Sequence, residues 1–254
     1  MTAVQVQATI TGPSDRPVVV LSNSLGATLG MWDAQVHELE RHFRVVRYNT
    51  RGHGDSPVPH GPYAIDDLAD DVIALLDRFA VQRAHLVGLS LGGMTAMRVA
   101  ARNPDRVDRV AVLCTATGLP PAENWLIRAQ TVRTQGSAAV AASVVERWFT
   151  PAYLAEHPDR RTIHESMVAG TPAEGYAGCC EAIATLDLRD DLASISAPLL
   201  AIAGADDPAT PPAKLEEIAG GVKDGRLLTV PRAAHLANAE RPEIVTAALG
   251  EHLG

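Results

Sequence analysis

The stretch VGLSLGG, residues 87–93, connects two different sequence patterns. The residues that lead into it, Ala84–Val87, are apolar without alternation, as expected for a strand buried on both faces of a parallel sheet. The residues that follow it have the apolar spacing of a helix. Gly88 and Gly92 leave room for a tight turn that holds the Ser90 hydroxyl at the carboxyl edge of the sheet. We therefore predict that Ser90 is a nucleophile; the alternative is that it only caps the helix.

The same alternation of short apolar runs and helical patterns covers most of the chain. The order predicts an α/β fold with a mostly parallel, doubly wound sheet and right-handed crossovers. Strands are expected at Val18–Ser22, Arg44–Tyr48, Ala84–Gly88, Val107–Cys114, Leu199–Ala203 and Arg226–Val230. Helices are expected at Trp32–Glu40, Ile65–Phe79, Leu91–Asn103, Lys214–Ala219 and Pro242–Leu253.

The alternation stops after Cys114 and resumes near Pro198. Between these points the sequence is helical in pattern, and the segment is too long for an ordinary connection. We interpret it as an inserted helical cap over the ends of the strands. The predicted division is core at residues 1–119, cap at 120–188 and core again at 189–254. The alternative is a set of extra helices packed away from any site.

A serine nucleophile needs a base to take its proton, and the base needs a third group to fix its tautomer. Two late strands supply candidates at their carboxyl ends, where open α/β sheets bind ligands. The first runs into Gly204-Ala205-Asp206-Asp207 and the second into a loop that ends at His235. We predict Asp207 as the acid and His235 as the base, because Gly-x-x-Asp is the usual spacing. Asp206 is the alternative acid.

Two backbone amides are expected to hold the oxyanion. One belongs to Leu91, the residue after the nucleophile, and the second to Leu25 in the loop after an early strand. Asn23 and Ser24, in the same loop, are candidates for an additional side-chain donor.

Composition excludes several other classes of protein. Among the 254 residues, Asp plus Glu (30) outnumber Lys plus Arg (22), the net charge is −8 and no basic run occurs, which argues against nucleic acid as a partner. No stretch approaches the ~20 apolar residues of a membrane span.

Three cysteines, two of them adjacent, favour the reducing cytoplasm over a disulfide framework. No phosphate loop, dinucleotide fingerprint or metal-ligand spacing is present, so no cofactor or metal is expected. The sequence gives no prediction of oligomeric state.

Several longer motifs identify a family. They are SNSLGATLGMWD (22–33), VGLSLGGMTAM (87–97), WFTPAY (148–153), GYAGCCEAIATLDLR (175–189) and IAGADDPATPP (202–212). Together they resemble the 3-oxoadipate enol-lactonases of the α/β-hydrolase superfamily, over nearly the whole chain. The stretch RGHGDS (51–56) is similar to a structural loop of capped α/β-hydrolases, in which Arg51 would brace neighbouring loops.

The resemblance implies an α/β-hydrolase fold and a cofactor-free enzyme that opens 3-oxoadipate enol-lactone to 3-oxoadipate in the degradation of aromatic acids. A small anionic lactone requires a local cation in a chain of net negative charge. Arg133 and Arg128 in the cap are the candidates, Arg133 being slightly favoured, with Trp125 and Trp148 as apolar walls.

Two kinds of alternative function remain open. One is another hydrolase on this scaffold, such as a carboxylesterase, a perhydrolase or a C–C hydrolase. The other is a receptor-like protein that binds a ligand without rapid turnover. A serine at position 90 excludes the dehalogenases of this fold, which have aspartate there.

Overall fold

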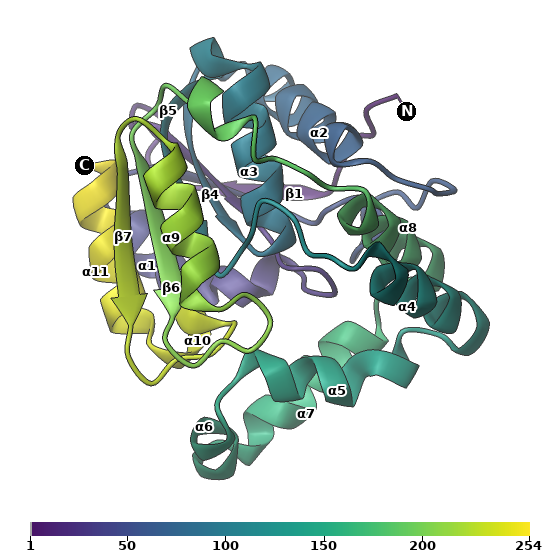
Figure 1. Cartoon of the computed structure of the whole chain (residues 1–254). Coiled ribbons are helices and arrows are strands. Elements are labelled where there is room, and N and C mark those ends of the chain that lie inside the picture. Colours follow the sequence, from purple (N-terminus) through teal and green to yellow (C-terminus); the bar gives the residue numbers. More distant parts are fainter. Residues whose placement is uncertain (1) are drawn as a thin grey trace.

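The computed structural model, which describes residues 2–254, is built around a seven-stranded sheet (Figure 1). The strand order is β1-β3-β2-β4-β5-β6-β7, and every neighbouring pair is parallel except β1 with β3. The strands are β1 (Ala8–Thr11), β2 (Val18–Ser22), β3 (Arg44–Tyr48), β4 (Ala84–Leu89), β5 (Val107–Leu113), β6 (Leu199–Gly204) and β7 (Gly225–Val230). The predicted α/β class with a mostly parallel, doubly wound sheet is confirmed.

The six predicted strands are confirmed to within one residue at each end. All residues of β4 and β6 are buried, which explains why their sequences do not alternate. Strand β1 was not predicted. Its four residues, ATIT, pair only with β3 at the edge of the sheet and are mostly half-buried, so they lack the continuous apolar run of the others.

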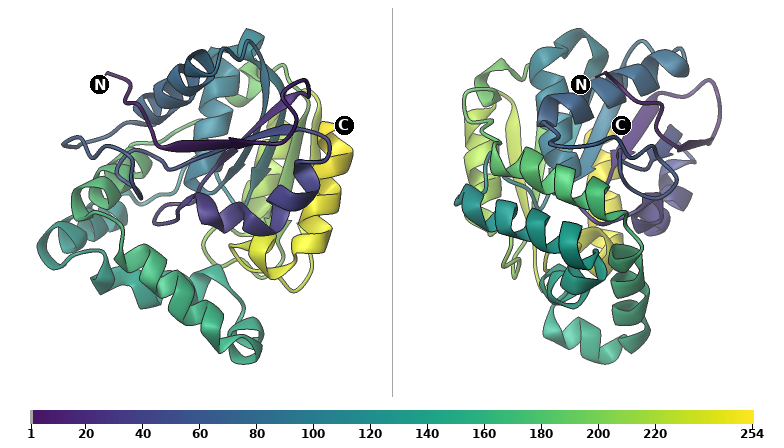
Figure 2. Two further views of the ribbon diagram at one scale, coloured as in Figure 1. Left: turned by 180° about the vertical axis from the view of Figure 1, so that it is seen from behind. Right: turned by 90° about the vertical axis from the view of Figure 1, so that its right-hand side faces the viewer.

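Helices cover both faces of the sheet (Figure 2). One face carries α2 (Ile65–Arg78), α3 (Leu91–Arg102) and α9 (Pro212–Gly221), and the other carries α1 (Asp33–Leu39) and α11 (Pro242–Leu253). These five helices confirm the predicted ones to within two residues. A short helix, α10 (Ala237–Glu240), precedes α11, and three 3-10 turns occupy Leu29–Trp32, Pro104–Arg106 and Leu192–Ser194.

Five helices lie between β5 and β6, and we refer to them as the cap. They are α4 (Ala122–Gln135), α5 (Ala138–Trp148), α6 (Pro151–Glu156), α7 (Pro158–Ala169) and α8 (Ala173–Ala184). Helix α4 packs on α8 and α5 packs on α7; in Figure 1, α5 and α7 lie at the bottom of the molecule and α4 and α8 at its right-hand side. The proposed domain limits at residues 119/120 and 188/189 stay a prediction. No helix within residues 2–254 has the length and apolar character needed to cross a bilayer.

Two glycines allow the cap helix α8 to pack closely against the core. A Cβ atom at Gly175 would lie 2.1 Å from the carbonyl oxygen of Gly52, and one at Gly178 would lie 2.7 Å from the ring of Tyr63. Both contacts are too short for any side chain. The glycines of the 175–189 motif are therefore required for the close approach of cap and core.

Candidate active site

Ser90 occupies a strained turn between β4 and α3. Its φ and ψ are +56° and −116°, a conformation that non-glycine residues adopt rarely and mainly at functional sites. The backbone N–H of Ser90 donates to Leu113 O (2.9 Å), which ties the turn to β5. A Cβ at Gly88 would lie 2.1 Å from Gly92 O, and one at Gly92 would lie 2.2 Å from Ser22 O. The tight turn inferred from the sequence therefore depends on both glycines.

Asp207 and His235 meet beyond the carboxyl ends of β6 and β7. The Nδ1 atom of His235 lies 2.8 Å from Oδ2 of Asp207, and both side chains are buried. Asp206, the alternative acid, is exposed to solvent. The acid that orients this imidazole is thus the one at the Gly-x-x-Asp spacing.

Thr210 holds the carboxylate of Asp207 in place. Its hydroxyl donates to Asp207 Oδ2 (2.6 Å) and its backbone N–H donates to Oδ1 (3.1 Å), while the hydroxyl also lies 3.2 Å from His235 Nδ1. The Ala209 N–H donates to Oδ1 as well (2.8 Å). Although burial opposes ionisation, the charge of His235 and the hydrogen bonds from His235 and Thr210 lower the pKa of Asp207 below its usual value. The acid is therefore held as a carboxylate.

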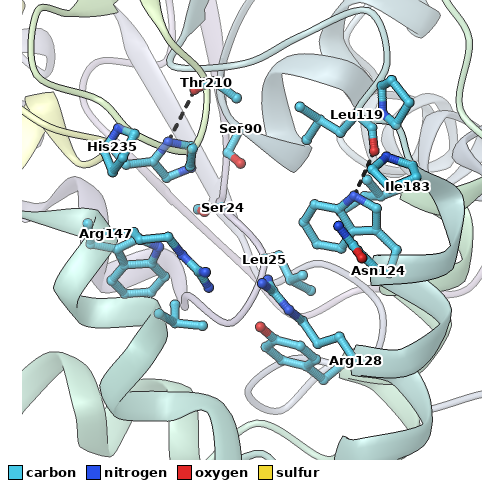
Figure 3. A pocket seen from close by; sticks show the side chains of 18 residues that line it. Ser24, Leu25, Ser90, Leu119, Asn124, Arg128, Arg147, Ile183, Thr210 and His235 are labelled. Carbon is cyan, nitrogen blue, oxygen red and sulfur yellow. Dashed lines mark hydrogen bonds between the residues drawn. The ribbon is translucent and has the colours of Figure 1, made fainter.

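Ser90 and His235 line the same cavity, which has a volume of about 260 Å³ (Figure 3). No hydrogen bond between the described residues links the Ser90 hydroxyl to the imidazole. Such contacts are often loose without a ligand and tighten when substrate binds. The core supplies the floor of the cavity and the cap supplies its roof; the other lining residues are Ser24, Leu25, Leu119, Pro120, Pro121, Asn124, Trp125, Arg128, Val144, Arg147, Trp148, Tyr176, Ile183, Pro208, Ala209 and Thr210.

The predicted oxyanion amides stand next to Ser90 and to the cavity. Leu91 is the first residue of α3, so its N–H precedes the hydrogen bonds of the helix. Leu25 lines the cavity, and within residues 2–254 its N–H has no acceptor, whereas the flanking Ser24 N–H donates to Met31 Sδ (3.3 Å). Of the two side-chain candidates, Ser24 lines the cavity. The amide of Asn23 is already used in bonds to Tyr48 O and Trp32 Nε1.

Two arginines of the cap point into the cavity from the side opposite Ser90 (Figure 3). Arg128, on α4, stacks over the ring of Trp125 at 4.7 Å. Arg147 lies on α5, and burial together with the charge of Arg128 lowers its pKa. Neither guanidinium has a carboxylate within salt-bridge distance among the residues that the structure describes. This part of the cavity is therefore positively charged and suited to an anion.

Arg133, the arginine favoured from the sequence, is not in the cavity. Its guanidinium binds Glu174 (2.8 Å from Nε) and Glu181 (2.9 Å from Nη2) on α8, and the hydrogen bond from Arg133 lowers the pKa of Glu174 to about 2. The preference for Arg133 was therefore wrong. Five residues turn a helix by about 140° beyond one full turn, so Arg128 and Arg133 cannot share a face.

The remaining cap predictions agree with the position of the cavity. Arg128, Trp125 and Trp148 all line it. Arg147 was missed, because which face of α5 meets the cavity depends on how the cap docks. Thr210 was also missed, although the Asp-x-x-Thr spacing of a capped turn is a signal for it.

Comparison with known proteins agrees with this geometry. Residues 17–147 match the protein family described as alpha/beta hydrolase fold. The chain belongs to this family. It is 42% identical to "3-oxoadipate enol-lactonase 2" of Acinetobacter baylyi over 232 residues; the aligned residues cover 91% of this chain and 86% of that protein. The crystal structure of the enol-lactonase from Burkholderia xenovorans LB400 has a TM-score of 0.95 and 41% identity, covering 98% of this chain and 96% of that one.

A second relative extends the agreement. "3-Oxoadipate enol-lactonase 1" of Acinetobacter baylyi is 38% identical over 236 residues, which cover 92% of this chain and 87% of that protein. The resemblance stated from the motifs is therefore confirmed. The chain is an enzyme of the hydrolase class.

Proposed function

We propose that this α/β-hydrolase opens 3-oxoadipate enol-lactone to 3-oxoadipate, in bacterial degradation of aromatic acids, with Ser90, Asp207 and His235 as its catalytic triad. One observation carries the proposal: a strained serine and an Asp–His pair face a cavity whose opposite wall presents two arginines without carboxylate partners. The relatives named above support the substrate.

The cavity fits the size and charge of this substrate. At about 260 Å³ it is slightly smaller than typical ligand pockets, which span roughly 300–1,000 Å³, so it suits a monocyclic acid better than a long acyl chain. The net charge of −8 repels anions at long range. Arg128 and Arg147 reverse that field locally and are placed to bind the substrate carboxylate while the lactone carbonyl lies at Ser90.

Acylation begins when His235 Nε2 takes the proton of the Ser90 hydroxyl and Oγ attacks the lactone carbonyl carbon. Asp207 keeps the proton of the imidazole on Nδ1, so Nε2 is free to act as the base. The amides of Leu25 and Leu91 donate to the oxyanion, and each such donor is worth about 3 kcal/mol. When the carbonyl re-forms, the ring C–O bond breaks and an enol leaves.

Ring opening yields an acyl-enzyme whose leaving group stays attached to the acyl chain. The leaving oxygen takes the proton from His235 as the ring C–O bond breaks, and the enol so formed then tautomerises to the ketone, which makes the step strongly downhill and prevents re-closure. Water activated by His235 then attacks the Ser90 ester, and 3-oxoadipate is released with Ser90 restored.

A spectrophotometric assay with freshly generated enol-lactone tests the proposal. We expect rapid loss of lactone absorbance, abolished in Ser90→Ala, and a much lower kcat/KM for a neutral ester of similar size. A neutral ester that is turned over as well as the lactone would favour the general carboxylesterase alternative. Stoichiometric binding of the lactone without turnover would favour the receptor-like one.

A further inference from the structure

His53, in the RGHGDS loop, is hydrogen-bonded to the segment Ser24–Ala27, which contains the predicted oxyanion donor Leu25. Its side chain is fully buried. Its Nε2 atom accepts a hydrogen bond from the backbone N–H of Gly26 at 2.9 Å. Gly26 follows Leu25 directly, so this bond fixes the peptide on the carbonyl side of the proposed oxyanion donor.

The bond defines the state of the imidazole. An Nε2 atom that accepts a hydrogen bond carries no proton, so the ring proton is on Nδ1, which donates to Arg51 O at 3.2 Å. Burial lowers the pKa of His53 to about 4, so the ring is neutral at neutral pH. His53 thus links two backbone segments through one donor and one acceptor.

Both ends of this link are rigid. The guanidinium of Arg51 is buried and bonds to Asp71 Oδ2 (2.6 Å) and to Asp67 O (3.0 Å), so the carbonyl that receives the Nδ1 proton belongs to an anchored residue. On the loop side, Gly26 has φ of +80°, and an added Cβ would lie 3.0 Å from the ring of Tyr176. The bond to His53 therefore sets the orientation of the Leu25–Gly26 peptide in a closely packed loop.

From this geometry we infer that His53 is a positioning residue for catalysis: its neutral Nε2 holds the Gly26 amide so that the neighbouring Leu25 N–H stays available for the oxyanion. The inference rests on the proposed role of Ser90 as nucleophile. The Ser24 N–H bond to Met31 Sδ fixes the other side of Leu25. A donor held from both sides needs no reorganisation when charge develops in the transition state. Without the His53 bond, the Gly26 amide is buried and unpaired, and the loop shifts to satisfy it.

Two substitutions separate this role from simple packing. In His53→Gln the side-chain amide reaches the position of Nε2, so its oxygen can accept the Gly26 N–H. In His53→Asn the amide reaches only the position of Nδ1, so it can donate to Arg51 O but leaves Gly26 without an acceptor. The two variants thus keep opposite halves of the link, and both are smaller and polar. Their melting temperatures show whether the fold survives equally in both.

The experiment compares wild type, His53→Gln and His53→Asn in two assays: hydrolysis of the enol-lactone, and the rate at which a fluorophosphonate labels Ser90. The labelling assay does not depend on the natural substrate, yet it still reports on the oxyanion donors, because the phosphoryl oxygen of the probe occupies the oxyanion position. We expect His53→Asn to slow both labelling and kcat about 10- to 100-fold, with KM unchanged, as for a displaced transition-state donor. We expect His53→Gln to stay within about 3-fold of wild type.

The outcomes distinguish the two proposals. If wild type is labelled at Ser90 and His53→Asn is labelled equally fast, the positioning role is overturned while the proposed nucleophile stands. Equal losses of labelling rate and kcat in both variants, together with lower melting temperatures, would show that His53 contributes only to packing. A wild type that does not react at Ser90 refutes the nucleophile and the role of His53 together.

Discussion

Replacing Arg147 by methionine should lower activity toward an anionic lactone and raise thermal stability. In the folded protein, burial and the charge of Arg128 both disfavour the Arg147 cation, as the direction of its pKa shift indicates. No carboxylate of the described chain lies within salt-bridge distance to compensate. Removing the charge relieves this repulsion, so the free energy of unfolding and the melting temperature should both rise. Such a trade of stability for function is typical of active sites.

The loss of activity can be bounded from the chemistry of the contact. A hydrogen bond to a charged group contributes about 1.5–3 kcal/mol. At about 1.4 kcal/mol per factor of ten, this corresponds to a loss of roughly 10- to 100-fold in kcat/KM for the lactone. The Coulomb attraction of two unit charges 4 Å apart near a protein surface is about 4 kcal/mol, an upper limit that the estimate respects. Arg128→Met should lose a similar factor, because both guanidiniums face the same part of the cavity.

The assay compares steady-state kinetics on the enol-lactone and on a neutral ester of equal size, together with thermal unfolding. Arg133→Met is the matched control: it removes the same charge from the cap, on α4, but outside the cavity. The control should keep its KM within about 2-fold and lose about 1 kcal/mol of stability, the upper range for a half-exposed ion pair. Arg147→Met should show the opposite combination.

The stability loss of the control should also depend on pH. The Arg133 hydrogen bond lowers the pKa of Glu174 from its ordinary 4.5 to about 2, so the stabilisation is complete above pH about 4.5 and disappears as pH falls toward 2. The difference in melting temperature between wild type and Arg133→Met should therefore shrink over that range. A difference that stays constant would show that the carboxylate does not contribute through its charge.

Two results would contradict the predictions for Arg147. The first is an equal loss of kcat/KM on lactone and neutral ester, because a carboxylate-binding residue cannot affect a substrate without a carboxylate. The second is a lower melting temperature in Arg147→Met, because this would mean that the cation is stabilised in the folded protein. The first result would leave Arg128 as the remaining candidate for binding the anion; the second would contradict only the predicted gain in stability.

The remaining predictions concern the triad and the seat of the cap. Asp207→Asn should lower kcat about 10⁴-fold, because an amide holds the wrong imidazole tautomer, while Asp206→Asn, next to it and exposed, should stay within about 3-fold in the same kinetic assay. Gly175→Ala should destabilise the protein by about 1–3 kcal/mol in urea unfolding, because its Cβ would lie 2.1 Å from Gly52 O. Gly220→Ala on α9, where an added Cβ meets nothing within 4 Å, should instead stabilise it by roughly 0.5–1 kcal/mol; equal effects of the two alanines would contradict the packing argument.

Most of the core could be predicted because its signals are local. Continuous apolar runs indicate strands that are buried on both faces. Asp207 and His235 follow two of the predicted strands, and because these strands are parallel neighbours in the sheet, the two side chains could be predicted to meet. Strand β1 lacked the signal, because a short edge strand needs no buried run. The choice of Asp207 rather than Asp206 as the acid could be made from the Gly-x-x-Asp spacing alone.

The cap was harder to predict because its residues function through the orientation of whole helices. Arg128 and Arg133 are equally basic and lie on the same helix, and only the packing of α4 on α8 decides which one faces the cavity. Glu174 and Glu181, whose carboxylates bind Arg133, are more than 40 residues away from it in sequence, so no local pattern links them to Arg133. Helical periodicity alone could have shown that the two arginines do not share a face with each other, but not which face is inside.

In the proposed site, catalysis and specificity are physically connected, because cap elements that line the cavity also bond to the loop that carries His235. The backbone N–H of Leu236, next to His235, donates to the carbonyl of Trp148, a wall of the cavity, at 2.8 Å. The buried carboxylate of Glu240 accepts the N–H of Ala234 (2.9 Å) and also bonds to Thr150, at the start of α6. A change of the cap that moves α5 or α6 must therefore move the loop that carries His235, the proposed base. It follows that substrate range cannot be altered by displacing α5 or α6 without a loss of kcat. A replacement that leaves these helices in place, such as Arg147→Met, or a change in α4, which has none of these bonds to the His235 loop, can change specificity alone.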